Sequence, residues 1–273
     1  RALAGTDVPV PHMYALCEDE SIIGRAFYIM EFKQGRVLWD QGLPGMANPQ
    51  RAAIYDEMNR VIAALHTVDV QQHGLSDYGK SGNYFERQIG RWSKQYQASI
   101  TQPIEEMDLL MDWLPAHMPD SARDERKRSI VHGDYRMDNL MFAPEEDRVV
   151  AVLDWELSTL GHPLADFSYH CMAWHIPASL GRGIGGLDIA ALGIPSEQDY
   201  MRSYCERTGL ATPEQLQADW NFYLAYNMFR IAAILQGIAK RVEAGTASSA
   251  QARAAGETAR PMAQLAWAYA QKH

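Results

Sequence analysis

His132-Gly-Asp-Tyr-Arg-Met-Asp-Asn139 is the stretch of this sequence that decides the fold, and Val-Leu-Asp-Trp-Glu follows it at residues 152–156. Short apolar runs occupy 140–142 and 149–153, and a proline with three acidic residues lies between them at 144–147. Short apolar runs separated by turn-forming residues predict a β-hairpin. The polar side chains of both motifs are therefore expected to gather where these strands begin and end.

Three of these polar side chains suit one kind of chemistry. Asp134 and Asn139 lie five positions apart in a loop that contains a glycine, and Asp154 ends the second predicted strand. Together they offer oxygen ligands for Mg²⁺ and one free carboxylate, as phosphoryl transfer requires. A single motif of this kind would more simply be a turn in which His132 and Asp134 cap the backbone. Two motifs in this order, with a hairpin between them, favour phosphoryl transfer.

The two motifs resemble the catalytic segments of the aminoglycoside phosphotransferase branch of the protein-kinase-like superfamily, in which His-Gly-Asp replaces His-Arg-Asp and Asp-Trp-Glu replaces Asp-Phe-Gly. The resemblance implies that Asp134 is the catalytic base and that His132 braces the loop. It implies that Asn139 and Asp154 hold Mg²⁺ and that Glu156 assists at a second metal or in its outer shell. ATP is the phosphoryl donor that the resemblance implies.

A second match lies upstream, where a β-rich run ends in Met30 and Glu31-Phe32-Lys33 follows. This segment resembles the last N-lobe strand and the hinge of the same family. The resemblance implies that the main chain of Glu31 and Lys33 faces the adenine of ATP, with Met30 at the back of the pocket. Phe32, between Glu31 and Lys33 in the sequence, belongs to the same predicted adenine site. An ordinary edge strand remains the alternative for this segment.

The resemblance implies an α+β, protein-kinase-like fold of two lobes. Residues 1–34 are then the remainder of the N-lobe with the hinge, and residues 35–273 form a large, mostly helical C-lobe that contains the β-hairpin. The runs 12–17 and 26–32 read as two strands, which do not make a stable sheet alone. We therefore expect the N-lobe to be incomplete in this chain, with the glycine loop, the phosphate-binding lysine and its glutamate partner upstream of Arg1.

Apolar residues at helical spacing, with proline and glycine at the borders, predict the remaining elements. The predicted helices are 49–68, with Asn48 as its cap, then 84–99, 104–114, 213–244 and 248–270.

Two further segments have a specific interpretation. The glycines of 181–186 match the letters of a nucleotide-binding loop, yet no β-rich run precedes them, so a substrate-side loop is the better interpretation. The stretch 161–167 resembles the family segment in which an aspartate at a helix start braces the catalytic loop, which gives Asp166 a structural role.

In this family the acceptor site lies among the C-terminal helices, which makes Tyr226, Asn227 and Arg230 candidate substrate residues. Tyr226 and Arg230 share a helix face because they are four residues apart. An arginine there could bind a carboxylate or phosphate of the substrate. A structural ion pair and an aromatic core contact explain the same residues equally well.

The stretches 154–161 and 229–238 look most like the kinase-like domains found beside, or fused to, acyl-CoA dehydrogenases. This resemblance implies that the acceptor is a small-molecule hydroxyl on a hydroxyacyl group or its CoA thioester, and that an acyl-CoA dehydrogenase is a partner. An aminoglycoside would need a dense acidic pocket, and the helical region has no concentrated acidic run. The alternative function is a catalytically silent pseudokinase that binds a nucleotide or acyl-CoA and regulates a partner.

Composition limits the remaining classes. The 273 residues carry 25 Lys and Arg against 34 Asp and Glu, a formal net charge of −9, which disfavours nucleic acid and anionic membranes as partners. No apolar run is long enough to span a membrane. The three cysteines, Cys17, Cys171 and Cys205, are odd in number and far apart, which is typical of a reducing, cytoplasmic setting rather than a disulfide framework.

Overall fold

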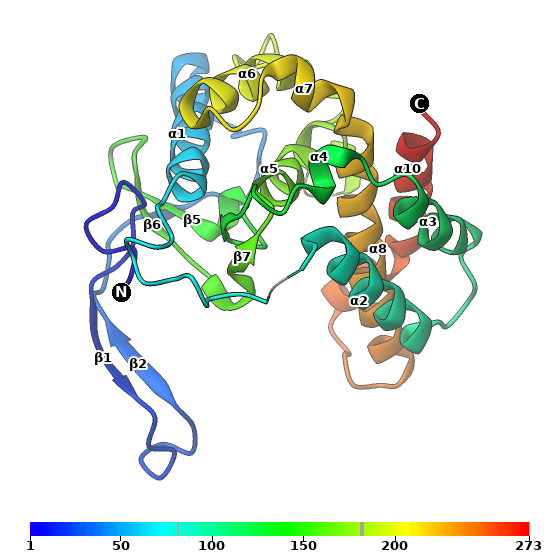
Figure 1. The fold of residues 1–273 in the computed structure, drawn as a ribbon, viewed down its shortest axis with the longest axis horizontal. Helices are drawn as coiled ribbons and strands as arrows, with labels where there is room; N and C mark the ends of the chain where they lie inside the picture. Colours follow the sequence, from blue (N-terminus) through cyan, green and yellow to red (C-terminus); the bar gives the residue numbers. More distant parts are fainter. Residues whose placement is uncertain (81, 181–182, 273) are drawn as a thin grey trace.

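A computed structural model describes residues 1–80, 82–180 and 183–272, which form a mixed α+β structure in which helices predominate (Figure 1). The strands belong to three small sheets, of two, three and two strands, within the described residues. The predicted α+β class, with helices predominating, is therefore confirmed. The strands and helices together position the loop 132–139.

The first two strands form an antiparallel hairpin that projects from the rest of the molecule (Figure 1). Strand β1 (Met13–Cys17) pairs with β2 (Phe27–Met30), with Cys17 opposite Phe27. The large side chains of Tyr14 and Tyr28 on this hairpin are 60% and 59% exposed. Both predicted strands are confirmed.

The other strands surround the loop that carries the first motif. A three-stranded antiparallel sheet has the order β3 (Arg36–Val37), β5 (Leu140–Phe142) and β6 (Val149–Val152). Strand β4 (Ser129–Val131) pairs with β7 (Thr159–Gly161). The predicted hairpin is β5 and β6. Because the loop leaves β4 and enters β5, it lies between the two sheets.

Three helices of the first half agree closely with the predicted ranges: α1 (Asn48–His66), α2 (Tyr84–Ser99) and α3 (Glu105–Ala116). Two further helices had no predicted range: α4 (Asp120–Arg123) and α5 (Pro163–Cys171). The predicted cap of α1 is wrong, because Ala47 is the capping residue and Asn48 already lies in the helix. The Asn48 amide instead donates a hydrogen bond to the Ala191 carbonyl, 2.9 Å away, a long-range contact that sequence spacing does not reveal.

The second half differs from prediction in where its helices break. Its helices are α6 (Glu197–Thr208), α7 (Pro213–Ala218), α8 (Trp220–Glu243), α9 (Ala250–Glu257) and α10 (Ala259–Ala270). The predicted helix 213–244 is two helices, broken at Asp219, whose carboxylate accepts a hydrogen bond from Ser121. The predicted helix 248–270 is likewise divided at Thr258.

Four short 3-10 helices complete the described structure, at Met137–Asn139, Trp155–Leu157, Met172–Trp174 and Ala178–Leu180. Positions 181 and 182 of the predicted loop 181–186 lie outside the described residues. After them, Gly183 and Gly185 lie so close to Ile176 that a Cβ atom at either position would meet its carbonyl oxygen, at 1.8 and 2.8 Å. Among the helices described, none is both long and apolar enough to cross a membrane.

The core is centred on α8, which packs against α2, α5 and α10 (Figure 1). Aromatic side chains fill much of it, including Phe85, Phe167, Tyr204 and Tyr226, each at most 1% exposed. Phe167 and Tyr204 stack with ring centroids 3.8 Å apart. Full burial of one such side chain contributes about 2 kcal/mol of stability.

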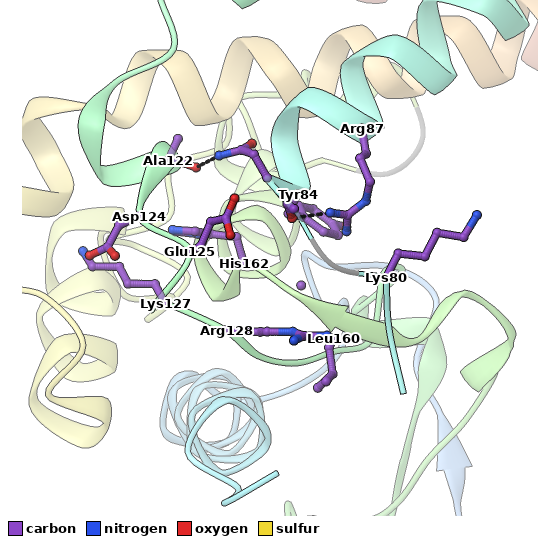
Figure 2. A pocket seen from close by; sticks show the side chains of 13 residues that line it. Lys80, Tyr84, Arg87, Ala122, Asp124, Glu125, Lys127, Arg128, Leu160 and His162 are labelled. Carbon is purple, nitrogen blue, oxygen red and sulfur yellow. Dashed lines mark hydrogen bonds between the residues drawn. The ribbon is translucent and has the colours of Figure 1, made fainter. Parts of the chain in front are cut away.

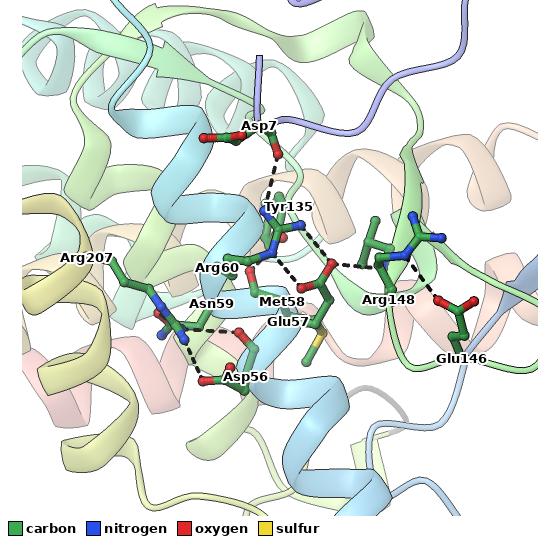
Figure 3. A network of polar contacts seen from close by, with 11 residues as sticks. Asp7, Asp56, Glu57, Met58, Asn59, Arg60, Tyr135, Glu146, Arg148 and Arg207 are labelled. Atoms are coloured by element: carbon green, nitrogen blue, oxygen red, sulfur yellow. Dashed lines mark hydrogen bonds and ion pairs between the residues drawn. The ribbon is translucent and has the colours of Figure 1, made fainter. Parts of the chain in front are cut away.

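A polar network joins α1 to the catalytic segment (Figure 3). Glu57 accepts hydrogen bonds from Arg60 at 2.6 and 2.8 Å and from the Val149 amide at 3.0 Å, which fixes β6 against the helix. Tyr135 donates its hydroxyl proton to the Met58 carbonyl at 2.8 Å. Since Met58 belongs to α1, this hydrogen bond holds the loop 132–139 to that helix.

Candidate active site

Asp166, in the first turn of α5, holds the start of the catalytic loop. Its carboxylate accepts the backbone N–H groups of His132, at 2.7 Å, and Gly133, at 2.9 Å. Burial raises the pKa of Asp166, but the hydrogen bonds from His66 and from the His132 amide favour the charged form, and the pKa stays below its usual value. The predicted bracing role of Asp166 is confirmed by these contacts.

His132 is fully buried and joins the loop to the end of β6. Its Nε2 lies 2.7 Å from the Leu153 carbonyl, and its Nδ1 accepts the Asp134 amide at 3.2 Å. Nδ1 is therefore the unprotonated nitrogen and Nε2 carries the proton. Both ring nitrogens are occupied by the backbone, an arrangement suited to bracing rather than to reaction.

Gly133 has a φ of +82°, and a Cβ atom there would meet the Leu157 carbonyl oxygen at 2.7 Å. Only glycine can adopt this backbone and allow this close approach. The turn at Gly133 brings the following residue, Asp134, to face a cavity.

Three groups hold the Asp134 carboxylate in one orientation. Tyr169 donates its hydroxyl proton to Oδ1, Arg136 Nε lies 3.1 Å from the same oxygen, and Asn139 donates to Oδ2 at 3.1 Å. The Asp134 side chain is 19% exposed and lines the cavity. A carboxylate held in this way can accept or orient a proton of a bound hydroxyl group.

Asn139 directly precedes β5, and Asp154 follows the end of the adjacent strand β6. Their side-chain oxygens are of the kind that Mg²⁺ binds. The side-chain amide nitrogen of Asn139 donates a hydrogen bond to the Asp134 carbonyl at 2.8 Å. The side-chain oxygen of Asn139 is therefore left to bind a metal. The Leu153 amide donates to the Asn139 carbonyl at 2.8 Å, so the next residue, Asp154, lies beside it. Asp154 and Glu156 are both exposed, and Asp154 has a φ of +60°.

The described residues contain no group of three or more His, Cys, Asp or Glu side chains placed to hold a metal ion. Mg²⁺ is commonly held by one or two carboxylates together with substrate phosphates and water. One carboxylate, one amide oxygen and a nearby exposed glutamate therefore fit a metal that is bound together with a nucleotide.

The predicted hinge follows β2 directly. Phe32 is 87% exposed and Met30 is 44% exposed. The Glu31 amide donates to the His12 carbonyl at 2.8 Å, and its carboxylate pairs with Lys33 at 2.9 Å. Residues 30–33 line neither the main cavity nor the smaller hollow. Their role at the adenine stays a prediction.

A cavity of about 700 Å³ opens beside Asp134. Asp134, Arg136, Tyr169 and Arg230 form its polar end, and aliphatic side chains of α8 with small residues of α9 form much of the rest. Burial lowers the pKa of His170, which also lines the cavity, to about 4, so this ring is neutral at pH 7. The described lining thus carries two positive charges and one negative charge.

Arg230 is the predicted substrate residue that reaches this cavity. It is 6% exposed and donates from Nη2 to the Gly133 carbonyl. Its guanidinium carbon lies 4.9 Å from the centre of the Tyr169 ring and 5.5 Å from that of Trp92, a cation–π arrangement.

The other two predicted substrate residues do not line the cavity. Tyr226 packs edge-on against Phe85, with ring centroids 4.9 Å apart. Asn227 is fully buried and donates to the Ala165 carbonyl at 3.0 Å and to Ser168 at 2.8 Å. These contacts agree with a structural role for both residues, because their side chains pack between α8 and its neighbouring helices.

Two residues at the polar end were not singled out from the sequence. Arg136 lies inside the first motif, two positions after Asp134, and that spacing could have identified it. Tyr169 lies in α5, 35 positions from Asp134, and no local pattern connects them. Burial raises the pKa of Tyr169, so its hydroxyl keeps the proton that it donates to Asp134.

A second, smaller hollow of about 110 Å³ lies between the start of α2, α4 and β7 (Figure 2). Lys80, Arg87, Lys127 and Arg128 give its rim a basic character. His162 also lines it, and burial lowers the pKa of that ring to about 4. None of the site residues predicted from the sequence lines this hollow.

The sequence matches the model of the phosphotransferase enzyme family over residues 1–202. The chain belongs to this family. The recognised resemblance is thereby confirmed, and the match includes the catalytic loop and the Asp-Trp-Glu segment.

Curated relatives carry names of a different enzyme. The chain is 47% identical over 274 residues to acyl-CoA dehydrogenase family member 10 of Mus musculus, which covers 100% of the chain and 25% of that protein. It is 38% identical over 264 residues to acyl-CoA dehydrogenase family member 11 of Homo sapiens, with 97% of the chain and 33% of that protein covered. The chain spans a quarter to a third of the length of these relatives.

Solved structures give the fold. A Ralstonia eutropha protein named for the aminoglycoside phosphotransferases superposes with a TM-score of 0.93 at 68% identity, covering 99% of this chain and 80% of that one. An aminoglycoside phosphotransferase APH(4)-Ia mutant, in ternary complex with AMP-PNP and hygromycin B, has a TM-score of 0.62 at 17% identity, covering 100% and 81%. Plasmodium vivax ethanolamine kinase has 0.57 at 13%, covering 96% and 69%.

These neighbours confirm the predicted kinase-like α+β fold. The family that the sequence matches is one of phosphotransferase enzymes. The division at residue 34 into an N-lobe remainder and a C-lobe stays a prediction.

Proposed function

We propose that this chain carries the catalytic loop of an ATP- and Mg²⁺-dependent phosphotransferase that phosphorylates a hydroxyl group of a small molecule. The observation that carries this proposal is the orientation of the Asp134 carboxylate. Tyr169, Arg136 and Asn139 hold it at the mouth of a cavity large enough for a small molecule. Such a carboxylate is the part of a kinase that orients the attacking hydroxyl.

Asp134 accepts the proton of the acceptor hydroxyl as the new oxygen–phosphorus bond forms. The bond between the transferred phosphorus and the ADP oxygen breaks, and the electron pair leaves with ADP. ATP supplies the phosphoryl group, and Mg²⁺ neutralises charge on the phosphates. Asn139 and Asp154 would hold the metal, with Glu156 nearby, and the main chain of residues 30–33 would face the adenine.

The lining of the cavity favours a neutral or anionic acceptor with an apolar part. Arg136 and Arg230 outnumber Asp134 at its polar end, which disfavours polycations such as aminoglycosides. We propose a hydroxyacyl group or its CoA thioester as the acceptor. The names of the curated relatives, which are acyl-CoA dehydrogenase family members, support this proposal and an association with such an enzyme.

The test replaces Asp134 with asparagine in the full-length protein, because Asp134→Asn keeps the shape and removes the proton-accepting charge. ADP release is measured with Mg-ATP and a panel of hydroxy acids and their CoA thioesters. We expect a fall in kcat of about 100-fold or more. Asp112→Asn, an exposed position on α3, is the matched control and should leave kcat unchanged.

The proposal is wrong if no acceptor in the panel stimulates ADP release by the unmodified protein, or if Asp134→Asn and Asp112→Asn behave alike. Tight nucleotide binding without turnover would instead favour a pseudokinase that regulates a partner.

A further inference from the structure

The apolar part of the main cavity follows one face of α8. Ile231, Ile234, Leu235 and Ile238 line it in succession from Arg230, at the spacing of a single helix face. All four are only half-buried, although the preceding turns of α8 are almost wholly buried. Eight residues at 1.5 Å each give this apolar arm a length of about 12 Å.

Residues of α9 and the start of α10 also line the cavity. Ala254 and Ala255 of α9 line it together with Thr258 and Met262, whereas α9 itself has no buried residue. Helix α9 is therefore an outer wall with solvent on its far side. The wall lies close to α8 because Gly256 approaches Ala239: a Cβ atom at Gly256 would be 3.0 Å from the Ala239 Cα.

The arm is continuous with the polar end of the cavity. Asp134 and Arg230 line the same cavity as Ile238 and Ala255. A molecule whose hydroxyl group lies at Asp134 can therefore extend an apolar chain along α8 only as far as the α9 wall permits. Aliphatic carbon gains about 0.8 kcal/mol per buried methylene group, so chain length affects affinity strongly.

We propose that α9 sets the length of the acceptor, with Ala255, which lines the same cavity as Ile238, as the specificity-determining residue. The inference rests on the proposed function for the position of the hydroxyl group at Asp134. The occupant is an aliphatic chain, because aliphatic side chains of α8 and alanines of α9 line this part of the cavity. A larger side chain at Ala255 shortens the arm, and a smaller one at Ile238 lengthens it.

The experiment measures binding without ATP, so that it does not depend on catalysis. Secondary alcohols with straight chains, from butyl to decyl length, are titrated into the full-length protein by calorimetry. Ala255→Leu should weaken binding of the decyl-length alcohol by about 10-fold or more and leave the butyl-length alcohol unchanged. Ile238→Ala should move the preferred length upward. Ala250→Leu, on the same helix but outside the cavity lining, is the matched control.

Equal losses for short and long alcohols, or an unchanged length profile in both cavity variants, would overturn the inference. If Ala255→Leu does not fold, Ile238→Ala decides, because it removes volume and cannot overpack the wall. The same alcohols are then offered with Mg-ATP. Length-dependent binding without ADP release refutes the proposed phosphotransferase but supports the role of α9 in setting the acceptor length. ADP release without length dependence supports the phosphotransferase and refutes the role of α9.

Discussion

Asp166 shows how one buried residue fixes the catalytic loop. Its two oxygens accept the His132 and Gly133 amides, and His66 Nε2 lies 3.3 Å from one of them. Removing the charge of a buried, fully bonded carboxylate leaves at least one loop amide without an acceptor. We expect Asp166→Asn to lower the free energy of unfolding by about 3 kcal/mol at neutral pH.

The pH dependence of this loss has a definite sign. The pKa of Asp166 is lowered in the folded protein despite the opposing effect of burial, because His66 and the loop amides stabilise the charged form. Its contribution is therefore complete above the usual aspartate pKa and disappears as the pH falls through the lowered one. Urea unfolding of both proteins from neutral pH to below pH 4 measures this. A difference that stays constant over the whole range contradicts the prediction.

At the scale of elements, Gly256 decides how closely α9 packs on α8. The Ala239 Cα and Cβ lie 3.0 and 3.1 Å from the place that a Gly256 Cβ would occupy. Gly256→Val must push the two helices apart, and we expect a loss of about 2 kcal/mol in stability, as for other overpacked sites.

Thermal unfolding measures the loss, with Gly237→Ala as the control. A Cβ atom at Gly237, on α8, meets only the end of Gln95 at 3.7 Å, so this control should be neutral or slightly stabilising. Equal stability of Gly256→Val and the unmodified protein would show that α9 does not pack as closely as its contacts indicate.

Helix boundaries also separate what periodicity predicts from what packing decides. The apolar period continues through Asp219 and Thr258, so the sequence predicts one helix where the structure has two. Asp219 ends α7 where its carboxylate meets Ser121, a residue 98 positions away. The break at Asp219 thus coincides with a tertiary contact, which a local pattern does not contain.

For the whole molecule, the net charge and the charge of the described cavity lining have opposite signs. The chain carries a formal −9, whereas Arg136 and Arg230 outweigh Asp134 in the described lining of the cavity. We expect hygromycin B to associate weakly with the surface at low salt and to lose this binding near 0.15 M salt, where charges beyond about 8 Å are screened.

Competition calorimetry against the decyl-length alcohol tests this prediction. The aminoglycoside should not displace the alcohol at any salt concentration, and it should not stimulate ADP release. Displacement that persists at 0.15 M salt would show that the cavity accepts a polycation and would contradict the charge argument.

The sequence by itself determined the family, the hairpin and the order of the catalytic motifs, because strand and turn patterns and the spacing of Asp134, Asn139 and Asp154 are local properties. Only the tertiary structure decided which side chains surround Asp134. Tyr169 and Arg230 come from helices distant in sequence, and helical periodicity places a residue on a face without stating what packs against it. For that reason the sequence could not separate Arg230, which reaches the cavity, from Tyr226, which lies in the core.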